Sequence, residues 1–457
     1  MADIAPLTPL RYDLARLPGG LGSVVAPPYD VISRDERVRL AAREAHNVAR
    51  LILPDGEGDA KYAEAARLLA EWRQRGVLVR DEQPAFYRHD QTFAPPGAPP
   101  GAPFIRRRGF LALVRLVPFS EGVVLPHERT LSGPKEDRLR LFRATGTNLS
   151  PGFMLYRDPR GELGSALEAA ETLSEFSTDD GVKHALAKVS HPDALRAIVD
   201  GVARCALLIA DGHHRYETAL RYAGEAAATP GALPRGEHAY FMTFLVNGDD
   251  PDLVVFPTHR HVHSLPGFSF DDLARRAAGL FHVEALPVGA DALAIASALG
   301  RAGRSGPALA AASRDGRVLL LTLSATADLA SHPTLGDKPA ALRRTDVTLL
   351  HTGILEPLLA ITPEAQAAKT HLWYPQDAPA ALAELRAGKG DVLFLMNATP
   401  VAQVREVAEA GHVMPQKSTF FYPKVPTGLA IHTLEPRRPV PSPAPLPALP
   451  ADAARPA

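Results

Sequence analysis

The sequence predicts a mixed α/β fold in which short buried strands alternate with amphipathic helices. Several apolar runs are too short for a buried helix and end at turn-forming residues, which is typical of strands. Between these runs, apolar residues recur at i, i+3, i+4 and i+7, the spacing of one helix face. The chain has 457 residues, too many for one ordinary core, so we expect two or three domains or subdomains.

The predicted elements are mixed along the whole chain rather than grouped by type. The strand patterns lie at 85–93, 110–117, 123–125, 152–156, 206–210, 239–246, 253–256, 318–323 and 391–397. The helical patterns lie at 162–175, 192–203, 215–226, 270–280, 346–360, 378–388 and 400–410. This mixture favours α/β or α+β layers.

Proline-rich stretches separate some of these elements. Residues 94–103 are only Ala, Pro and Gly, which predicts a long, mobile hairpin loop between two strands. Ala26-Pro27-Pro28 predicts a rigid turn ahead of a helix capped by Ser33. Structure alone explains this turn, so a role of Tyr29 or Asp30 in a functional site is the less favoured interpretation.

The expected organisation is one family-sized domain at 10–432, followed by a Pro/Ala tail at 433–457 that we expect to be disordered. Within the domain we expect smaller units. Their expected bounds are 10–200 for an N-terminal subdomain, 201–269 for a core, 270–390 for a lateral α/β unit and 391–432 for a C-terminal return.

Composition excludes several classes of protein. The formal net charge is −1, so no basic field is available to hold an extended nucleic acid. Cys205 is the one cysteine, so the chain forms no internal disulfide and no thiolate metal site. The first residues lack the pattern of a secretion signal, and no segment has the ~20 apolar residues of a membrane span. We therefore expect a cytoplasmic, soluble protein.

The most informative motif is Asp211-Gly212-His213-His214-Arg215, which follows the strand at 206–210 and begins a helix. The N-terminus of a helix offers free N–H groups and a positive dipole end, which suit an anion. A glycine there allows close approach of a ligand. The alternative is a tight turn in which Asp211 only caps the helix. The four ionisable residues of the motif exceed what a cap needs, which favours a phosphate-handling active site.

A second cluster combines His127 and Glu128 with Lys135 and Arg138. The first pair follows a predicted strand and can supply a general base. The second pair falls on one helical face and can hold an anion. The alternative interpretation is a solvated, charged helix start.

A third cluster lies at residues 411–424 and contains Lys417, Ser418, Thr419 and Lys424. Its spacing imitates a phosphate loop, but Gln416 replaces the second glycine and no strand precedes it. We reject a nucleotide-triphosphatase loop and keep these four residues as donors to an anion.

A fourth cluster contains His259, His261 and His263, which share one face if the segment is a strand. Three imidazoles suit a transition metal, but spacing fixes no partner carboxylate. His259 and Arg260 as phosphate donors are therefore the favoured interpretation.

These motifs resemble a bacterial family known as domain of unknown function 1015. The resemblance covers about 10–432 and rests on six motifs in order: APPYDVIS, HNVARLILP, PHERT, ADGHHRYETAL, FPTHR and MPQKSTFFYPK. The family name implies no activity.

The turn from Asp211 to Arg215 also resembles, more remotely, the phosphate-binding turn of the ParB and sulfiredoxin superfamily, which includes kinases of free serine. Sulfiredoxins have a cysteine where this chain has His213, so the resemblance excludes sulfinic-acid repair. ParB proteins have Gly-Glu-Arg-Arg there. The histidines and the neutral charge favour the kinase branch, and the resemblance implies a ParB/sulfiredoxin-like phosphate-binding core with additional α/β subdomains.

This resemblance implies transfer of phosphate from ATP or ADP to the hydroxyl of a small metabolite, with L-serine as the leading acceptor. Asp211 would hold Mg²⁺ or orient the hydroxyl, and Glu128 or Glu217 would take its proton. His213, His214 and Arg215 would cradle the phosphate. The remaining candidate binding residues are Gly212, His127, Lys135, Arg138, His259, Arg260, Lys417, Ser418, Thr419 and Lys424.

Three alternatives stay open at this point. They are a nucleotide-binding regulator without transfer activity, a phosphoester hydrolase with the same cradle, and a non-enzymatic DNA-binding protein, which the neutral charge disfavours. In the favoured interpretation the partners are a nucleotide and a small molecule, without extended nucleic acid or membrane.

Overall fold

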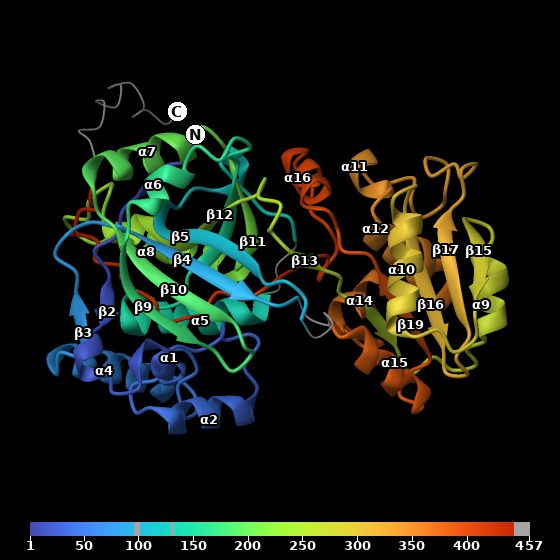
Figure 1. The fold of residues 1–457 in the computed structure, drawn as a ribbon, viewed down its shortest axis with the longest axis horizontal. Helices are drawn as coiled ribbons and strands as arrows, with labels where there is room; N and C mark the ends of the chain where they lie inside the picture. The colour runs from blue at the N-terminus through green and yellow to red at the C-terminus, as the bar shows by residue number, and fades with distance from the viewer. Residues whose placement is uncertain (96–100, 129–131, 443–457) are drawn as a thin grey trace.

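The computed structural model describes residues 1–95, 101–128 and 132–442, and these form two α/β bodies. Figure 1 shows the bodies side by side, the first in blue to green and the second in yellow to orange. The last described segment, in red, returns to the first body. The predicted mixed α/β fold is therefore confirmed. Within the described ranges, no helix is both long and apolar enough to span a membrane.

The first body is built on a nine-stranded sheet with the order β6-β11-β8-β12-β5-β4-β10-β9, and β1 pairs with β5 off this path. β6–β11 and β8–β12 are parallel pairs, and the other pairs are antiparallel. The strands are β1 Ile4–Ala5, β4 Phe86–Phe93, β5 Ile105–Arg115, β6 Val124–Leu125, β8 Gly152–Tyr156, β9 Glu171–Ser177, β10 Lys183–Val189, β11 Leu207–Asp211 and β12 Tyr240–Asn247.

Both faces of this sheet are buried. Alternate side chains of β12 enter two different cores: Met242 and Phe244 lie in one, and Phe241 and Leu245 lie in the other. This alternation follows from the two-residue period of a strand. The helices of this body are α1 Gly20–Val24, α2 Arg34–Arg43, α3 Ala49–Ile52, α4 Ala60–Gln74, α5 Ser132–Thr145, α6 Gly164–Glu168, α7 Pro192–Val202 and α8 His213–Ala227.

The second body is built on a six-stranded antiparallel sheet with the order β15-β17-β16-β19-β14-β18. Its strands are β14 Arg260–Val262, β15 Phe281–Leu286, β16 Ala308–Ser313, β17 Val318–Leu323, β18 Leu372–Trp373 and β19 Val392–Met396. Its helices are α9 Phe270–Ala277, α10 Ala292–Gly303, α11 Ala340–Arg343, α12 Asp346–Leu350, α13 Glu356–Leu359, α14 Pro363–Ala368 and α15 Ala378–Arg386, with a π-helix at His351–Leu355.

Three small ladders and one helix complete the connections between and within the bodies. Val404 and Val407 of α16, Val401–Glu409, pack in the core of the first body. The ladders are β2 Leu10–Tyr12 with β3 Leu78–Arg80, β7 Thr147–Asn148 with β21 His432–Thr433, and β13 Val255–Phe256 with β20 Phe420–Phe421.

All nine predicted strands are present, and those at 152–156 and 318–323 have the predicted bounds. The predicted helix at 162–175 is wrong in its second half, because α6 ends at Glu168 and residues 171–177 form edge strand β9. Pairing with β10 overrides the helix-forming residues there. Ser33 caps α2, as predicted, by accepting a hydrogen bond from the Glu36 N–H at 3.2 Å.

Two expected boundaries differ from the structure. β11 and β12 lie inside the nine-stranded sheet with β4 and β5, so the structure has no division at residue 200. Residues 433–442 pack on the first body instead of forming a tail, since Leu434 and Val440 are buried. Residues 96–100 of the predicted hairpin loop and 443–457 of the predicted tail lie outside the described residues.

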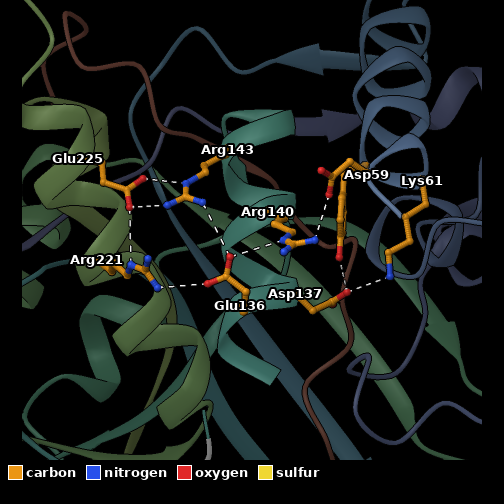
Figure 2. Close-up of polar contacts among 9 residues, drawn as sticks. Asp59, Lys61, Glu136, Asp137, Arg140, Arg143, Arg221 and Glu225 are labelled. Carbon is orange, nitrogen blue, oxygen red and sulfur yellow. Dashed lines mark hydrogen bonds and ion pairs between the residues drawn. The ribbon is translucent and has the colours of Figure 1, made fainter. Parts of the chain in front are cut away.

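A network of ion pairs fixes α5 between α4 and α8 (Figure 2). Glu136 of α5 contacts Arg221 of α8 at 3.3 Å, and Arg143 of α5 contacts Glu225 of α8 at 2.8 Å. On the other side, Asp137 contacts Lys61 of α4 at 3.0 Å. Exposed pairs of this kind contribute about 0–1 kcal/mol each, so the network orients α8 more than it stabilises the fold.

Candidate phosphate-binding site

The Asp-Gly-His-His-Arg turn connects a buried strand to a long helix, as the sequence predicts. Asp211 is the last residue of β11, and α8 begins at His213. Gly212 is the N-cap residue with φ of 95° and makes no side-chain cap. Asp211 therefore does not cap the helix, which rules out the alternative interpretation of this motif. The first intrahelical hydrogen bond joins Tyr216 N–H to Gly212 C=O, so the first turn directs main-chain N–H groups outward.

This turn forms one wall of a cavity of about 290 Å³. The cavity lies where the first body, the second body and the C-terminal return meet. Nine of the predicted site residues line it: Glu128, Asp211, Gly212, His213, His214, Arg215, Lys417, Thr419 and Lys424.

Asp211 is the centre of the charged groups in this cavity. Its carboxylate accepts from Lys424 Nζ at 2.7 Å and pairs with Arg215 Nη2 at 3.3 Å. Burial by itself raises the pKa of Asp211, but the charges of Lys424 and Arg215 outweigh burial and hold the pKa well below its usual range. Asp211 is thus ionised at neutral pH. Arg215 Nη1 donates to Pro151 C=O. The guanidinium therefore connects the turn to the segment that precedes β8.

The imidazoles of His213, in this turn, and of its neighbour His127 are neutral. His127 Nδ1 lies 2.6 Å from Ile209 C=O and donates to it, and His127 N–H donates to His213 Nε2 at 3.2 Å. Burial lowers the pKa of His127 to about 4 and lowers the pKa of His213 well below its ordinary value. Burial also lowers the pKa of His214, the other imidazole of the turn, so the cationic groups of the cavity are its lysines and Arg215.

Glu128 is the carboxylate best suited to act as a base. It is half-buried in the cavity wall, in a parallel bridge with Met414. Burial raises the pKa of Glu128, although a hydrogen bond and the charge of Lys417 oppose the rise. A carboxylate with a raised pKa accepts a proton more readily near neutral pH than an exposed one.

The loop that carries Lys417 is fixed from several sides. Met414 N–H donates to His127 C=O at 2.8 Å. Arg260 Nη2 donates to Lys417 C=O at 3.0 Å, and Ser418 Oγ donates to Pro415 C=O. Lys417 has φ of 59°, a left-handed conformation that costs a non-glycine residue free energy and persists where the surroundings impose it.

Lys424 is positioned by two buried side chains of the nine-stranded sheet. Gln91 Nε2 donates to Lys424 C=O at 3.1 Å. Arg107 donates to Gln91 Oε1 and to Pro423 C=O, and its guanidinium lies 4.8 Å from the ring centre of Phe153. β4 and β5 thereby hold the segment at 423–424 against the cavity.

Several predicted binding residues do not line the cavity. His127, His259, Arg260 and Ser418 are buried and bonded to other protein groups. His127 Nε2 lies 2.8 Å from Thr419 Oγ1, and His259 Nδ1 accepts from Met396 N–H at 3.1 Å. They are positioning residues instead of phosphate donors.

Three more charged residues predicted for the site, Lys135, Glu217 and Arg138, lie outside the cavity because their side chains contact other parts of the protein. Lys135 forms an ion pair with Glu217 across the α5–α8 contact, which removes both from the cavity. Arg138 is buried, donates to Ile52 C=O at 2.7 Å and lies 4.3 Å from the ring centre of Tyr29. The helical periodicity that grouped Lys135 and Arg138 is present, but both side chains face other helices.

The cavity also contains residues that the sequence did not assign to it. Tyr29 and Asp30 line one side, and Lys369 and Gln376 reach it from the second body. Thr258 is 2% exposed. The residue lines the cavity, and its hydroxyl is fully buried and has no hydrogen-bond partner among the described residues. The APPYD motif was the one available signal for Tyr29 and Asp30.

The three imidazoles at 259–263 do not form a metal site. His263 stacks on Trp373 with ring centres 4.2 Å apart, and His259 is bonded to the main chain of β19. Within 1–95, 101–128 and 132–442, no cluster of three or more His, Cys, Asp or Glu side chains is arranged to hold a metal ion.

Three solved structures are similar to this chain at low identity. A conserved hypothetical protein from Pyrococcus furiosus is 15% identical, with 67% of this chain and 93% of that chain covered and a TM-score of 0.32. A free serine kinase in complex with AMP is 15% identical, with 67% and 89% covered and a TM-score of 0.34. SbnI with a C-terminal truncation, from Staphylococcus aureus, is 9% identical, with 71% and 87% covered and a TM-score of 0.35.

A search of curated proteins found no match to the sequence. The model of the family described as "Protein of unknown function (DUF1015)" matches residues 4–348. This match confirms the resemblance inferred from the motifs. Because it covers well over half of the chain, the protein belongs to the DUF1015 family.

Proposed function

We propose that this protein is a phosphotransferase that moves a phosphoryl group from ATP or ADP to the hydroxyl of a small metabolite. One observation carries the proposal: a single cavity is lined by the first turn of α8, three lysines and a half-buried glutamate with a raised pKa. Phosphoryl transfer needs mainly positioning and charge neutralisation, together with a group that orients or deprotonates the acceptor.

In the proposed reaction, Glu128 accepts the proton of the acceptor hydroxyl. The acceptor oxygen forms a bond to the terminal phosphorus, and the bond from that phosphorus to the bridging oxygen breaks. ATP then leaves as ADP, or ADP leaves as AMP. Lys417, Lys424 and the N–H groups of the first turn of α8 neutralise the charge on the phosphoryl oxygens.

A magnesium ion would enter with the nucleotide. Mg²⁺ in such sites is held by one or two carboxylates and by phosphate oxygens, so a protein cage of many ligands is not required. Asp211 and Glu128 both line the cavity, and the charge of Asp211 contributes to the raised pKa of Glu128. Asp211 is the proposed ligand, and Lys424 would exchange its carboxylate for a phosphate oxygen. The ion would supply charge stabilisation at the phosphoryl group.

The acceptor is proposed from the resemblance of the turn at 211–215 to that of free-serine kinases, so L-serine is the first candidate. Lys369, on the side of the second body, offers a charged donor for the carboxylate of such an acceptor. The proposed partners are thus a nucleotide and a small hydroxylated metabolite.

The test is a mass-spectrometric assay of the purified protein with Mg²⁺, ATP or ADP and a pool of hydroxylated metabolites that includes L-serine. We expect an acceptor that gains the mass of one phosphate. Glu128→Gln should lower the rate by about 10²-fold or more, the range measured for general bases. Glu217→Gln is the matched control, since Glu217 lies outside the cavity, and it should keep the wild-type rate.

Two results would contradict the proposal. Nucleotide hydrolysis without an acceptor product would favour a nucleotide-dependent regulator, and phosphate release from phosphoserine without nucleotide would favour a hydrolase. Asp211→Asn should also abolish the product. Its melting temperature, compared with that of the wild type, distinguishes lost chemistry from a lost fold.

A further inference from the structure

A second cavity, of about 300 Å³, adjoins the candidate phosphate site. The two cavities share four lining residues: Val31, Gln376, Phe420 and Lys424. Each cavity alone is at the small end of the range of small-molecule sites, about 300–1,000 Å³. Together they offer one continuous site for a ligand with two parts.

The walls of the second cavity are mainly apolar. Val25, Ala26 and Leu40 line it from the N-terminal segment, and the rings of Phe420 and Tyr422 line it from the C-terminal return. Flat apolar surfaces beside aromatic rings suit a planar heterocycle, which stacks on such rings.

The turn between β9 and β10 gives this cavity an acidic wall. Thr178 and Asp180 lie on this turn, and His184 lies at the start of β10. Arg43 also lines the cavity, but it is paired with Asp179 of the same turn. Thr178 Oγ1 donates to Asp180 Oδ1 at 2.5 Å and lies 3.0 Å from His184 Nε2. This chain of hydrogen bonds orients the Asp180 carboxylate. A carboxylate accepts from an amino group and repels a phosphate.

We infer that the adenine base of the nucleotide occupies this second cavity, with its exocyclic amino group toward Asp180 and its phosphates toward Lys424. This inference rests on the proposed function, because it assigns the base of the nucleotide used there. The Asp180 carboxylate in the second cavity and the lysines of the first match a molecule with an amine at one end and phosphates at the other.

A third cavity, of about 220 Å³, is the competing location. It lies beside the π-helix and shares only Gln416 with the phosphate site. His351 Nε2 accepts from Arg260 Nε at 3.0 Å, and its Nδ1 lies 2.8 Å from Gln366 Oε1. These two polar side chains are already satisfied by protein groups, so they are poor candidates to read a base.

The test compares the binding of ADP with that of inorganic pyrophosphate, which has no base, by calorimetric titration. Glu36 is a half-buried residue of α2 that lines the second cavity. Glu36→Trp fills this space and should weaken ADP binding about tenfold or more, with pyrophosphate binding unchanged. Ala367→Trp places the same side chain in the third cavity and should change neither affinity.

Asp180→Asn is a second variant, and the direction of its effect on ADP affinity is diagnostic. Removal of a negative charge near an anion strengthens or preserves its binding. A weaker affinity for ADP with unchanged pyrophosphate binding therefore marks a contact to the base. We expect a loss of about fivefold, the value of one hydrogen bond near 1 kcal/mol.

Unchanged ADP affinity in both Glu36→Trp and Asp180→Asn would overturn the placement of the base and leave the proposed function standing. Weakened ADP binding in Ala367→Trp would also overturn it. If the wild-type protein binds neither ADP nor pyrophosphate, the proposed function fails together with the inference. Retained pyrophosphate binding in each variant serves as the check that it is folded.

Discussion

At the scale of single residues, the site depends on a few groups with altered properties. Asp211 stays ionised because two cations face it, and burial raises the pKa of Glu128. These opposite shifts separate the roles of two carboxylates in one cavity. Gly212 permits the sharp connection between strand β11, which ends at Asp211, and helix α8.

The conformation of Gly212 gives the first prediction at this scale. Its φ of 95° is unfavourable for a side chain, and a Cβ would lie 3.0 Å from Arg215 Nε. Gly212→Ala should lower the free energy of unfolding by about 1–2 kcal/mol and weaken ADP binding. Gly224→Ala on the same helix has open space and should be neutral or stabilising by about 0.5–1 kcal/mol. Chemical denaturation measures both, and equal effects would contradict this account of the turn.

The sequence was sufficient for the strand–turn–helix at 207–227 and for half of the residues that line the cavity. It failed where long-range contacts decide the outcome. Lys135 and Arg138 share a helix face as predicted, but that face packs on neighbouring helices. Tyr29, Thr258 and Lys369 reach the cavity from segments whose proximity no local spacing reveals.

At the scale of elements, strands with strong alternation or β-branched residues were predictable. β17 consists of Val, Leu and Thr residues and has its predicted bounds, 318–323. β16, Ala308–Ser313, is mostly alanine and was missed. Alanine has a low strand propensity, and here burial between two neighbouring strands imposes the conformation. For the same reason the sequence predicts a helix where the edge strand β9 forms: pairing with β10 outweighs the local preference of these residues.

At the scale of the whole molecule, the candidate site is composite. The first body contributes Asp211 at the end of β11 and the first turn of α8. The second body contributes Lys369 and Gln376, and the return at 414–424 contributes two lysines. Arg260 of β14 fixes the loop of Lys417, and Arg107 of β5 fixes the segment of Lys424. Both bodies must therefore be folded and in contact for the cavity to form.

The buried histidines predict how the stability of the whole molecule depends on pH. Burial lowers their pKa values from about 6.5, so between pH 6.5 and 4 the unfolded chain binds more protons than the folded one. The free energy of unfolding should fall as the pH decreases through this window, by about 1.4 kcal/mol per pH unit for each histidine. The residues with pKa values of about 4 are His127, His184, His259 and His432, and that of His351 is about 3.

Buried carboxyl groups with raised pKa values oppose part of this effect. Glu237 and Asp346 are of this kind, and the pKa of Asp346 is about 6. The histidines outnumber them, so acid unfolding followed by circular dichroism should begin above pH 4. Acid unfolding that begins only below pH 4, in the range of ordinary carboxylates, would contradict the account of a neutral histidine core.

The central claim, that the cavity at the start of α8 binds the phosphates of a nucleotide, is tested most directly by calorimetric titration with ADP. We predict one binding site in the wild-type protein. In Lys424→Met the affinity should fall about tenfold or more, because a charge-assisted contact contributes about 1.5–3 kcal/mol. Lys389→Met, which removes an exposed lysine paired with Glu384 outside the cavity, should leave the affinity unchanged. Absence of ADP binding in the wild type, or equal affinities of all three proteins, would contradict the claim.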